Sequence, residues 1–542
     1  MTELQLPRTR LMPPLLVALA VAILAASLLR AGTSAATAFG WSNGILLDGG
    51  WRVFSGQAPH HDFHSPVGYL YLTLVSLAMR LWGPTTHALA QSAALILPLL
   101  AAAAWFIGSR RMPRLLTAAT AIFIVVHAAS VSYFGSTNSQ GISFGGQYSR
   151  MAWAVFFLVP LHALILPQRP APRWREHGED LVLGIVLGVL FGIKVTYFAA
   201  ALGCIAVGRV TGPAELHWRG LPALAVGCTL AIGGGLLASG APLGGYLADL
   251  AMAGRSNADG PVAMLIQQIL RIDPLQMGLL LAAVLVAWPG LVLAPRFARL
   301  PVPLLRALAL LLLGFGISAY NGTEYTSPIY GMVLLVIACG ATAPPTRESG
   351  ALAVAVLLGM AAHIALPTVR VGARGRVVPP PEQTLDHGPY RNVEFVAGSP
   401  ATTDADQLVP YLTRTPSAVL ANAYLLWLRD GLAHLRRHAR PGAVIATMDV
   451  ANPFPFALQS PSPRGDVLFW HLDRNVSAAT APAAERALGD AEVVMVPARS
   501  LMAGMTAGKM ALYRPYLEAH FTPIALDGDR WWQEMWVRSP RR

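Results

Sequence analysis

Long runs of apolar residues, separated by short polar connections, dominate the first two thirds of the chain. These runs lie at 11–29, 88–107, 115–133, 151–167, 181–208, 221–240, 275–294, 303–319, 328–344 and 350–367. A helix that crosses the hydrocarbon of a bilayer needs about 20 mostly apolar residues. The pattern therefore predicts an α-helical polytopic membrane protein.

Arginines mark the connections that we expect on the cytoplasmic side. They cluster at 108–114, 168–180, 209–220 and 295–302, and cytoplasmic loops are the ones enriched in Lys and Arg. The first run follows Arg8 and Arg10. A cleaved signal peptide is the alternative, but its apolar core takes about 7–15 residues. We expect an uncleaved first helix with the N-terminus in the cytoplasm.

Two segments decide how often the chain crosses. If 67–82 spanned the membrane, the arginines of 108–114 would fall outside, so we expect it to lie along the outer surface as an interfacial helix. The run 181–208 is long for one helix and has basic connections on both sides. Two short helices hinged near Lys194 would satisfy the charge rule. These choices give about eleven spans, with external loops at 30–87 and 134–150.

The pattern changes near residue 368, after which polar and apolar residues mix. Strands alternating with helices indicate an α/β domain. We expect strands at 443–450, 491–498 and 522–528, and helices at 423–439, 481–488 and 509–521. The predicted division is a transmembrane domain over 1–367 and an extracytoplasmic, periplasmic α/β domain over 368–542.

Composition agrees with a membrane location. The chain is 54% hydrophobic and 13% charged, against about 25% charged residues in soluble domains. The net charge of +12 does not indicate nucleic-acid binding, because the arginines sit in short clusters between apolar runs. The three cysteines, Cys204, Cys228 and Cys339, lie inside apolar runs and form no CxxC pair. We expect them to pack rather than to form disulfides or a zinc site.

Polar residues collect in the segments predicted to lie outside. The first loop carries Asp48, Arg52, His60, His61, Asp62 and His64, the second carries Tyr148 and Arg150, and a later one carries Asn321 and Glu324. Lys194 interrupts an apolar run, and an ionisable residue at such a place is functional by default. Lysine near a helix end can also extend its amine to the membrane surface.

These residue types suit an enzyme that acts on a lipid-linked donor. Asp48 or Asp62 would take a proton from an acceptor hydroxyl, and Arg52, Arg150 and Lys194 would hold a phosphate. We expect His60, His61, His64, Tyr148, Tyr197, Asn321 and Glu324 to contact the substrate. Structural alternatives stay open: Asp48 could cap a helix, Asp62 could brace its loop, and Arg150 could pair with lipid headgroups. No cofactor is expected; a divalent metal is left open but not predicted.

The arrangement resembles the GT-C superfamily of membrane glycosyltransferases, which includes protein mannosyltransferases and lipid A aminoarabinose transferases. The phrase from Gly56 to Phe63, "GQAPHHDF", looks like "G-x-x-P-Y-x-D-F" of that superfamily, and a proline-led segment and a basic "GSRRMPR" loop follow it. "QYSRMAWAVF" at 147–156 and "IKVTYFAA" at 193–200 are similar to further family phrases. Many members carry Asp-Glu just after the first span, where this chain has Ser42 and Asn43.

The resemblance covers roughly residues 10–210. It implies an inverting glycosyltransferase of the bacterial inner membrane that moves a sugar from a polyprenyl-phosphate donor to an extracytoplasmic glycan, lipid or protein acceptor. In such families an acidic residue of the first loop acts as the base or orients the acceptor. Two other classes stay open: a transporter or lipid-carrier flippase, and a non-catalytic scaffold of envelope polysaccharide assembly.

Overall fold

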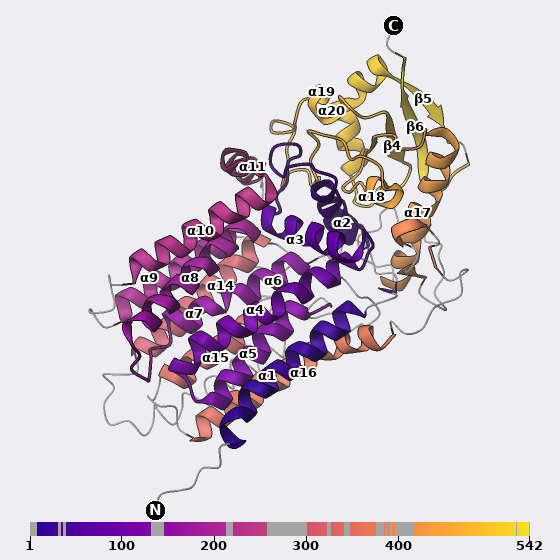
Figure 1. Ribbon diagram of the computed structural model, residues 1–542. Coiled ribbons are helices and arrows are strands. Elements are labelled where there is room, and N and C mark those ends of the chain that lie inside the picture. Colours follow the sequence, from indigo (N-terminus) through magenta and orange to yellow (C-terminus); the bar gives the residue numbers. More distant parts are fainter. Residues whose placement is uncertain are drawn as a thin grey trace, which may run out of the picture.

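The structure is a computed structural model, and it places a helical bundle beside a smaller domain that contains a β-sheet (Figure 1). The described residues are 8–30, 34–35, 40–131, 146–212, 220–256, 301–321, 327–340, 347–374, 417–526 and 528–540, with short pieces between 384 and 398.

Apolar helices build the bundle. Its long helices are α1 (Arg8–Leu29), α4 (Ala88–Arg111), α5 (Arg114–Ala129), α8 (Arg173–Ile193), α9 (Val195–Thr211), α10 (Leu221–Ser239), α14 (Pro301–Asn321), α15 (Ser327–Gly340) and α16 (Arg347–Arg374). Among the described residues, α1, α4, α10, α14 and α16 are long and apolar enough to cross a membrane. This confirms the polytopic helical class. The predicted span at 275–294 lies outside the described residues, and α16 continues past residue 367, so the predicted domain division stays a prediction.

The predicted break at Lys194 is present. Lys194 has extended backbone angles, φ −163° and ψ 109°, between α8 and α9. At its far end α9 approaches α7 (Leu158–Ala163) so closely that a Cβ on Gly208 would lie 2.3 Å from the Ala163 carbonyl oxygen. That carbonyl lies near Ile165, which accepts a hydrogen bond from the Arg111 side chain. Helix α9 therefore returns to the end of the bundle that carries the arginines, here called the arginine end.

The segment predicted to lie along the membrane surface does not cross the bundle. It forms α3 (Tyr69–Trp82), which packs on α2 (Gly40–Phe54). Gly68, just before α3, donates its N–H to the Ile193 carbonyl at 3.2 Å. Just after α3, Thr86 donates to the carbonyl of Pro389, which belongs to the C-terminal region. Both ends of α3 therefore lie at the end opposite the arginines, here called the domain end, as charge parity predicted.

The span predicted at 151–167 is divided in two, into α6 (Gln147–Phe156) and α7. At the domain end, the short helix α11 (Leu243–Ser256) follows α10 and lies to one side of α2 and α3 (Figure 1).

The C-terminal domain holds a four-stranded sheet of order β3-β4-β6-β5. Its elements are α17 (Ser417–His438), β3 (Ile445–Thr447), α18 (Phe454–Leu458), α19 (Ala484–Ala487), β4 (Val493–Pro497), α20 (Met505–His520), β5 (Phe521–Ala525) and β6 (Trp532–Arg538). Strands β3 and β4 are parallel, and β6 is antiparallel to both β4 and β5. Every predicted strand and helix of this region is present, and β6 is an element that the prediction missed.

Two short elements complete the described part. The strand β1 (Ser34–Ala35) pairs in parallel with β2 (Val393–Glu394), and a 3-10 turn, η4 (Gly388–Tyr390), lies between residue 384 and β2. The β1–β2 pair connects the segment after α1 to the segment that leads into the C-terminal domain.

Candidate functional site

The C-terminal domain holds the first loop at the domain end. The Trp51 indole and the Gln57 amide donate to the carbonyl oxygens of Ser460 and Ser462, at 2.8 and 2.7 Å. His64 shares two backbone hydrogen bonds with the same segment, to the Asp466 carbonyl and from the Leu468 N–H. The loop that sequence analysis singled out is therefore the contact surface between the bundle and the domain.

Asp48 and Arg52 form a buried ion pair within this contact. Arg52 Nε donates to Asp48 Oδ2 at 2.8 Å, and each residue is 1% exposed. The Ser462 hydroxyl donates to Asp48 Oδ1, and Arg52 Nη1 donates to the Pro463 carbonyl oxygen. Burial raises the pKa of the Asp48 carboxyl despite the neighbouring Arg52 guanidinium. Through these contacts, Asp48 and Arg52 connect α2 to the C-terminal domain.

Asp62 braces its own loop. Its Oδ2 accepts the Ala58 backbone N–H at 2.8 Å, and its Oδ1 lies 3.2 Å from His61 Nδ1 and 3.6 Å from Arg464 Nη1. The His61 side chain is 70% exposed. Asp62 thus lies near the surface, with its carboxylate partly engaged.

His60 and His64 meet on one carboxylate, Asp249 of α11. Their Nδ1 atoms lie 2.7 and 2.6 Å from Asp249 Oδ2 and Oδ1, and the Ser65 N–H also donates to Oδ2. Burial alone would raise the pKa of Asp249, but the hydrogen bonds from the two histidines outweigh it, so the pKa is lowered. An ionised Asp249 fixes both rings, with the His64 side chain 17% exposed.

Asp249 was not among the residues predicted from the sequence. It is the one carboxylate in the apolar stretch 221–256, which is a signal that an acidic residue there has a buried partner. The partner is 185 residues away in the sequence, so spacing did not reveal it.

Arg150 and Lys194 gather with two tyrosines at the hinge between α8 and α9. The Lys194 ammonium donates to the Ser149 hydroxyl at 2.7 Å and lies 4.5 and 5.7 Å from the ring centres of Tyr148 and Tyr197. Arg150 is 7% exposed and donates to the Gln147 side chain. A cation–aromatic group of this kind positions positive charge where little water competes. We call Tyr148, Arg150, Lys194 and Tyr197 the hinge cluster.

The histidine loop and the hinge cluster are neighbours. The Gly68–Ile193 hydrogen bond joins the end of the loop to the residue before Lys194. In α3, Tyr69 lies 6.4 Å from the His60 ring, whereas Tyr71 lies 6.0 Å from the Tyr148 ring. The start of α3 therefore contacts both groups, His60 through Tyr69 and the hinge cluster through Tyr71, whereas Asp48 and Arg52 lie in the contact with the C-terminal domain.

Two predicted residues are not located by these contacts. Asn321 is the last residue of α14, with a side chain outside the described part, and Glu324 lies outside the described residues. Within the described part of the chain, no group of three or more His, Cys, Asp or Glu is arranged to hold a metal ion.

Comparison with known proteins gives one fold-level similarity. The chain is similar to ArnT from Cupriavidus metallidurans, whose crystal structure contains undecaprenyl phosphate, at 14% sequence identity and a TM-score of 0.48. The match covers 97% of this chain and 99% of ArnT. No protein-family model and no curated protein matches the chain. At this level of similarity, the roles of individual residues rest on this chain's own geometry.

Proposed function

We propose that the protein is an inverting membrane glycosyltransferase that uses a polyprenyl-phosphate-linked sugar. The acceptor is a glycan, lipid or protein on the extracytoplasmic side. The observation that carries the proposal is the hinge cluster, which places two cations and two aromatic rings beside a loop that bears proton acceptors. Those are the two chemical needs of transfer from a phosphate-linked donor.

The hinge cluster suits the donor. Departure of the sugar leaves negative charge on a phosphate, and preorganised cations stabilise such charge most when they need not move. Lys194 is held by Ser149, and Arg150 by Gln147. In this proposal Arg150 and Lys194 bind the phosphate, Tyr148 and Tyr197 line its surroundings, and Arg52 has a structural role.

The loop suits the acceptor. Because His64 Nδ1 faces the carboxylate of Asp249, the neutral ring carries its proton on Nδ1 and leaves Nε2 as a proton acceptor. His64 Nε2 would take the proton of the acceptor hydroxyl. The hydroxyl oxygen would form a bond to the anomeric carbon while the bond from that carbon to the phosphate oxygen breaks. Asp62 is the second proton acceptor on the loop, and Asp249 positions the His64 ring.

Release of polyprenyl phosphate tests the proposal. Purified protein would be incubated with a panel of polyprenyl-phosphate sugars and envelope-derived acceptors. We expect release with at least one donor, and a loss of about 100-fold or more in Lys194→Gln and in Arg150→Gln. Arg80→Gln is the matched control, because Arg80 is an exposed cation of α3 at the same end.

The base is tested in the same assay. His64→Gln should reduce turnover by about 10²–10⁴-fold, the usual worth of a general base, and Asp62→Asn should reduce it less. If no donor releases polyprenyl phosphate, but the protein moves a lipid-linked sugar from one leaflet of a vesicle membrane to the other, the protein is a transporter and the proposal fails.

A further inference from the structure

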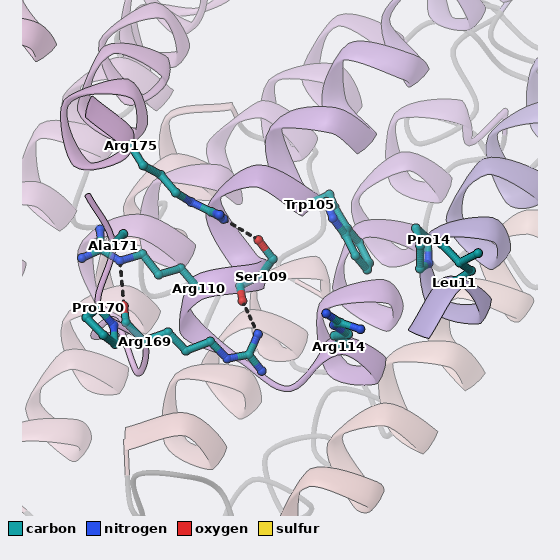
Figure 2. Close-up of a pocket in the computed structure, with 10 residues that line it drawn as sticks. All are labelled: Leu11, Pro14, Trp105, Ser109, Arg110, Arg114, Arg169, Pro170, Ala171 and Arg175. Atoms are coloured by element: carbon teal, nitrogen blue, oxygen red, sulfur yellow. Dashed lines mark hydrogen bonds between the residues drawn. The ribbon is translucent and has the colours of Figure 1, made fainter. Parts of the chain in front are cut away.

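A second cationic site lies at the arginine end, opposite the hinge cluster. It is a cavity of about 450 Å³ between α1, α4 and the start of α8 (Figure 2). Its polar lining includes Ser109, Arg110, Arg114, Arg169 and Arg175. Four arginines around one cavity indicate an anionic ligand, since the planar guanidinium matches phosphate oxygens.

Hydrogen bonds hold three of these arginines in place. Arg175 Nη2 donates to the Ser109 hydroxyl at 2.8 Å, and Arg169 Nη1 donates to the Ser109 carbonyl oxygen at 3.0 Å. Arg110 Nε donates to the Arg169 carbonyl oxygen at 3.0 Å. Figure 2 shows the side chains fixed in this way around Ser109. A site whose donors are already ordered loses little conformational freedom when an anion binds.

Positive charge exceeds negative charge among the ion pairs described here. Arg110 pairs with Glu176 and lies 3.6 Å from Glu179, and Arg175 lies 3.7 Å from Glu179. Glu179 also pairs with Arg111, which does not line the cavity. Two carboxylates therefore offset a larger number of arginines, which leaves net positive charge for a bound anion.

The opposite side of the cavity carries apolar side chains next to Arg114 (Figure 2). Figure 2 shows Leu11 and Pro14 of α1 and Trp105 of α4 across the cavity from Arg169 and Arg175. Leu11 is 63% exposed, and α1 and α4 are both among the helices apolar enough to span a bilayer. Trp174, in the first turn of α8, is 70% exposed, and tryptophan is enriched at the level of lipid headgroups. The cavity thus joins a cationic wall to a surface that faces acyl chains.

We propose that this cavity binds the phosphate of an anionic phospholipid, with the acyl chains along α1 and α4. Basic pockets between membrane helices on the cytoplasmic side suit such headgroups, because that leaflet is anionic. The apolar side chains favour a lipid over free phosphate, because only a lipid has acyl chains that can pack against Leu11 and Trp105. The inference concerns a site separate from the proposed sugar transfer and does not depend on it.

Native mass spectrometry of the full-length protein tests the proposal. Protein in a neutral detergent would be mixed with phosphatidylglycerol, with phosphatidylcholine, or with millimolar inorganic phosphate. We expect retention of phosphatidylglycerol over phosphatidylcholine, and at least a tenfold weaker retention in Arg114→Gln/Arg169→Gln. Arg173→Gln is the control, because Arg173 is an exposed arginine at the same end that does not line the cavity.

Three results would overturn the proposal. Equal retention of both phospholipids would show that the anionic headgroup is not recognised. Equal losses in the double variant and in Arg173→Gln would indicate a general surface charge rather than a site. Displacement of the lipid by millimolar phosphate would assign the cavity to a soluble anion. Retention by the wild type and the control, with loss in the double variant, supports it even if turnover is unchanged.

Discussion

Replacing Asp48 by Asn separates a structural role of this residue from a catalytic one. The change keeps the side chain's shape and an acceptor for Ser462, but it leaves the Arg52 charge buried without its counter-ion. Both residues are 1% exposed. Breaking a buried ion pair by removing one partner costs about 3–5 kcal/mol. We expect Asp48→Asn to lower the free energy of unfolding by an amount in that range.

The double variant shows whether the pair itself is responsible. Replacing a buried ion pair by apolar groups of similar volume is often neutral, so Asp48→Leu/Arg52→Met should recover most of the loss. Stability would be measured by unfolding with SDS in mixed micelles, with Arg80→Gln as the exposed control. The polyprenyl-phosphate release assay would be run on the same samples below the unfolding transition.

The refuting result is specific. If Asp48→Asn unfolds like the wild type and yet abolishes turnover, Asp48 is a catalytic group and the structural argument is wrong. If stability falls and turnover per folded molecule stays within a few fold, the ion pair has the fastening role that its contacts with Ser462 indicate.

Three further predictions concern the loop and the C-terminal domain. Gly68→Ala should disrupt the loop and reduce turnover, because its Cβ would lie 2.2 Å from a backbone oxygen, whereas Gly233→Ala meets nothing within 4 Å and should be silent. Asp249→Asn should speed hydrogen exchange of the Ser65 amide at neutral pH. Because the pKa of Asp249 is lowered from its ordinary 3.8, the wild type should lose that protection only as the pH falls below this ordinary value. Burial raises the pKa of Asp449 to about 6 from its ordinary 3.8. The buried carboxyl therefore loses its proton less readily in the folded protein than in the unfolded chain, and the free energy of unfolding falls as the pH rises from about 4 to about 6. Relative to Asp449→Asn, the free energy of unfolding of the wild type should be about 1 kcal/mol higher at pH 5 than at pH 7 in the same unfolding assay. Unchanged exchange of the Ser65 amide would contradict the Asp249 prediction, and an equal difference at both pH values would contradict the Asp449 prediction.

Much of the bundle followed from local pattern. The hinge at Lys194 was predictable because the 28-residue run 181–208 is long for one span and a lysine interrupts it. The position of both ends of α3 at the domain end followed from the arginines of 108–114, which would lie on the external side if this segment crossed the membrane. The strand β6 was missed although "WQEMWVR" is rich in strand-forming aromatic and branched residues, because one acidic residue, Glu534, and one basic residue, Arg538, obscure its alternation.

The site was less predictable, because its contacts join distant parts of the chain. Asp48 and Ser462 are 414 residues apart, and His60 and Asp249 are 189 apart. The sequence indicates which residues of the first loop are acids, bases or cations, but not which of them the C-terminal domain buries. The C-terminal domain buries Asp48 and Arg52 through contacts with Ser462 and Pro463. Helix α11 supplies Asp249, which binds His60 and His64.

The position of a bound lipid phosphate tests the central claim most directly. The measurement is a cryo-electron microscopy structure of the protein with polyprenyl phosphate. The account predicts phosphate density in contact with the side chains of Arg150 and Lys194 at the hinge of α8 and α9. Phosphate density elsewhere at the domain end, with Arg150 and Lys194 making only protein contacts, would contradict it.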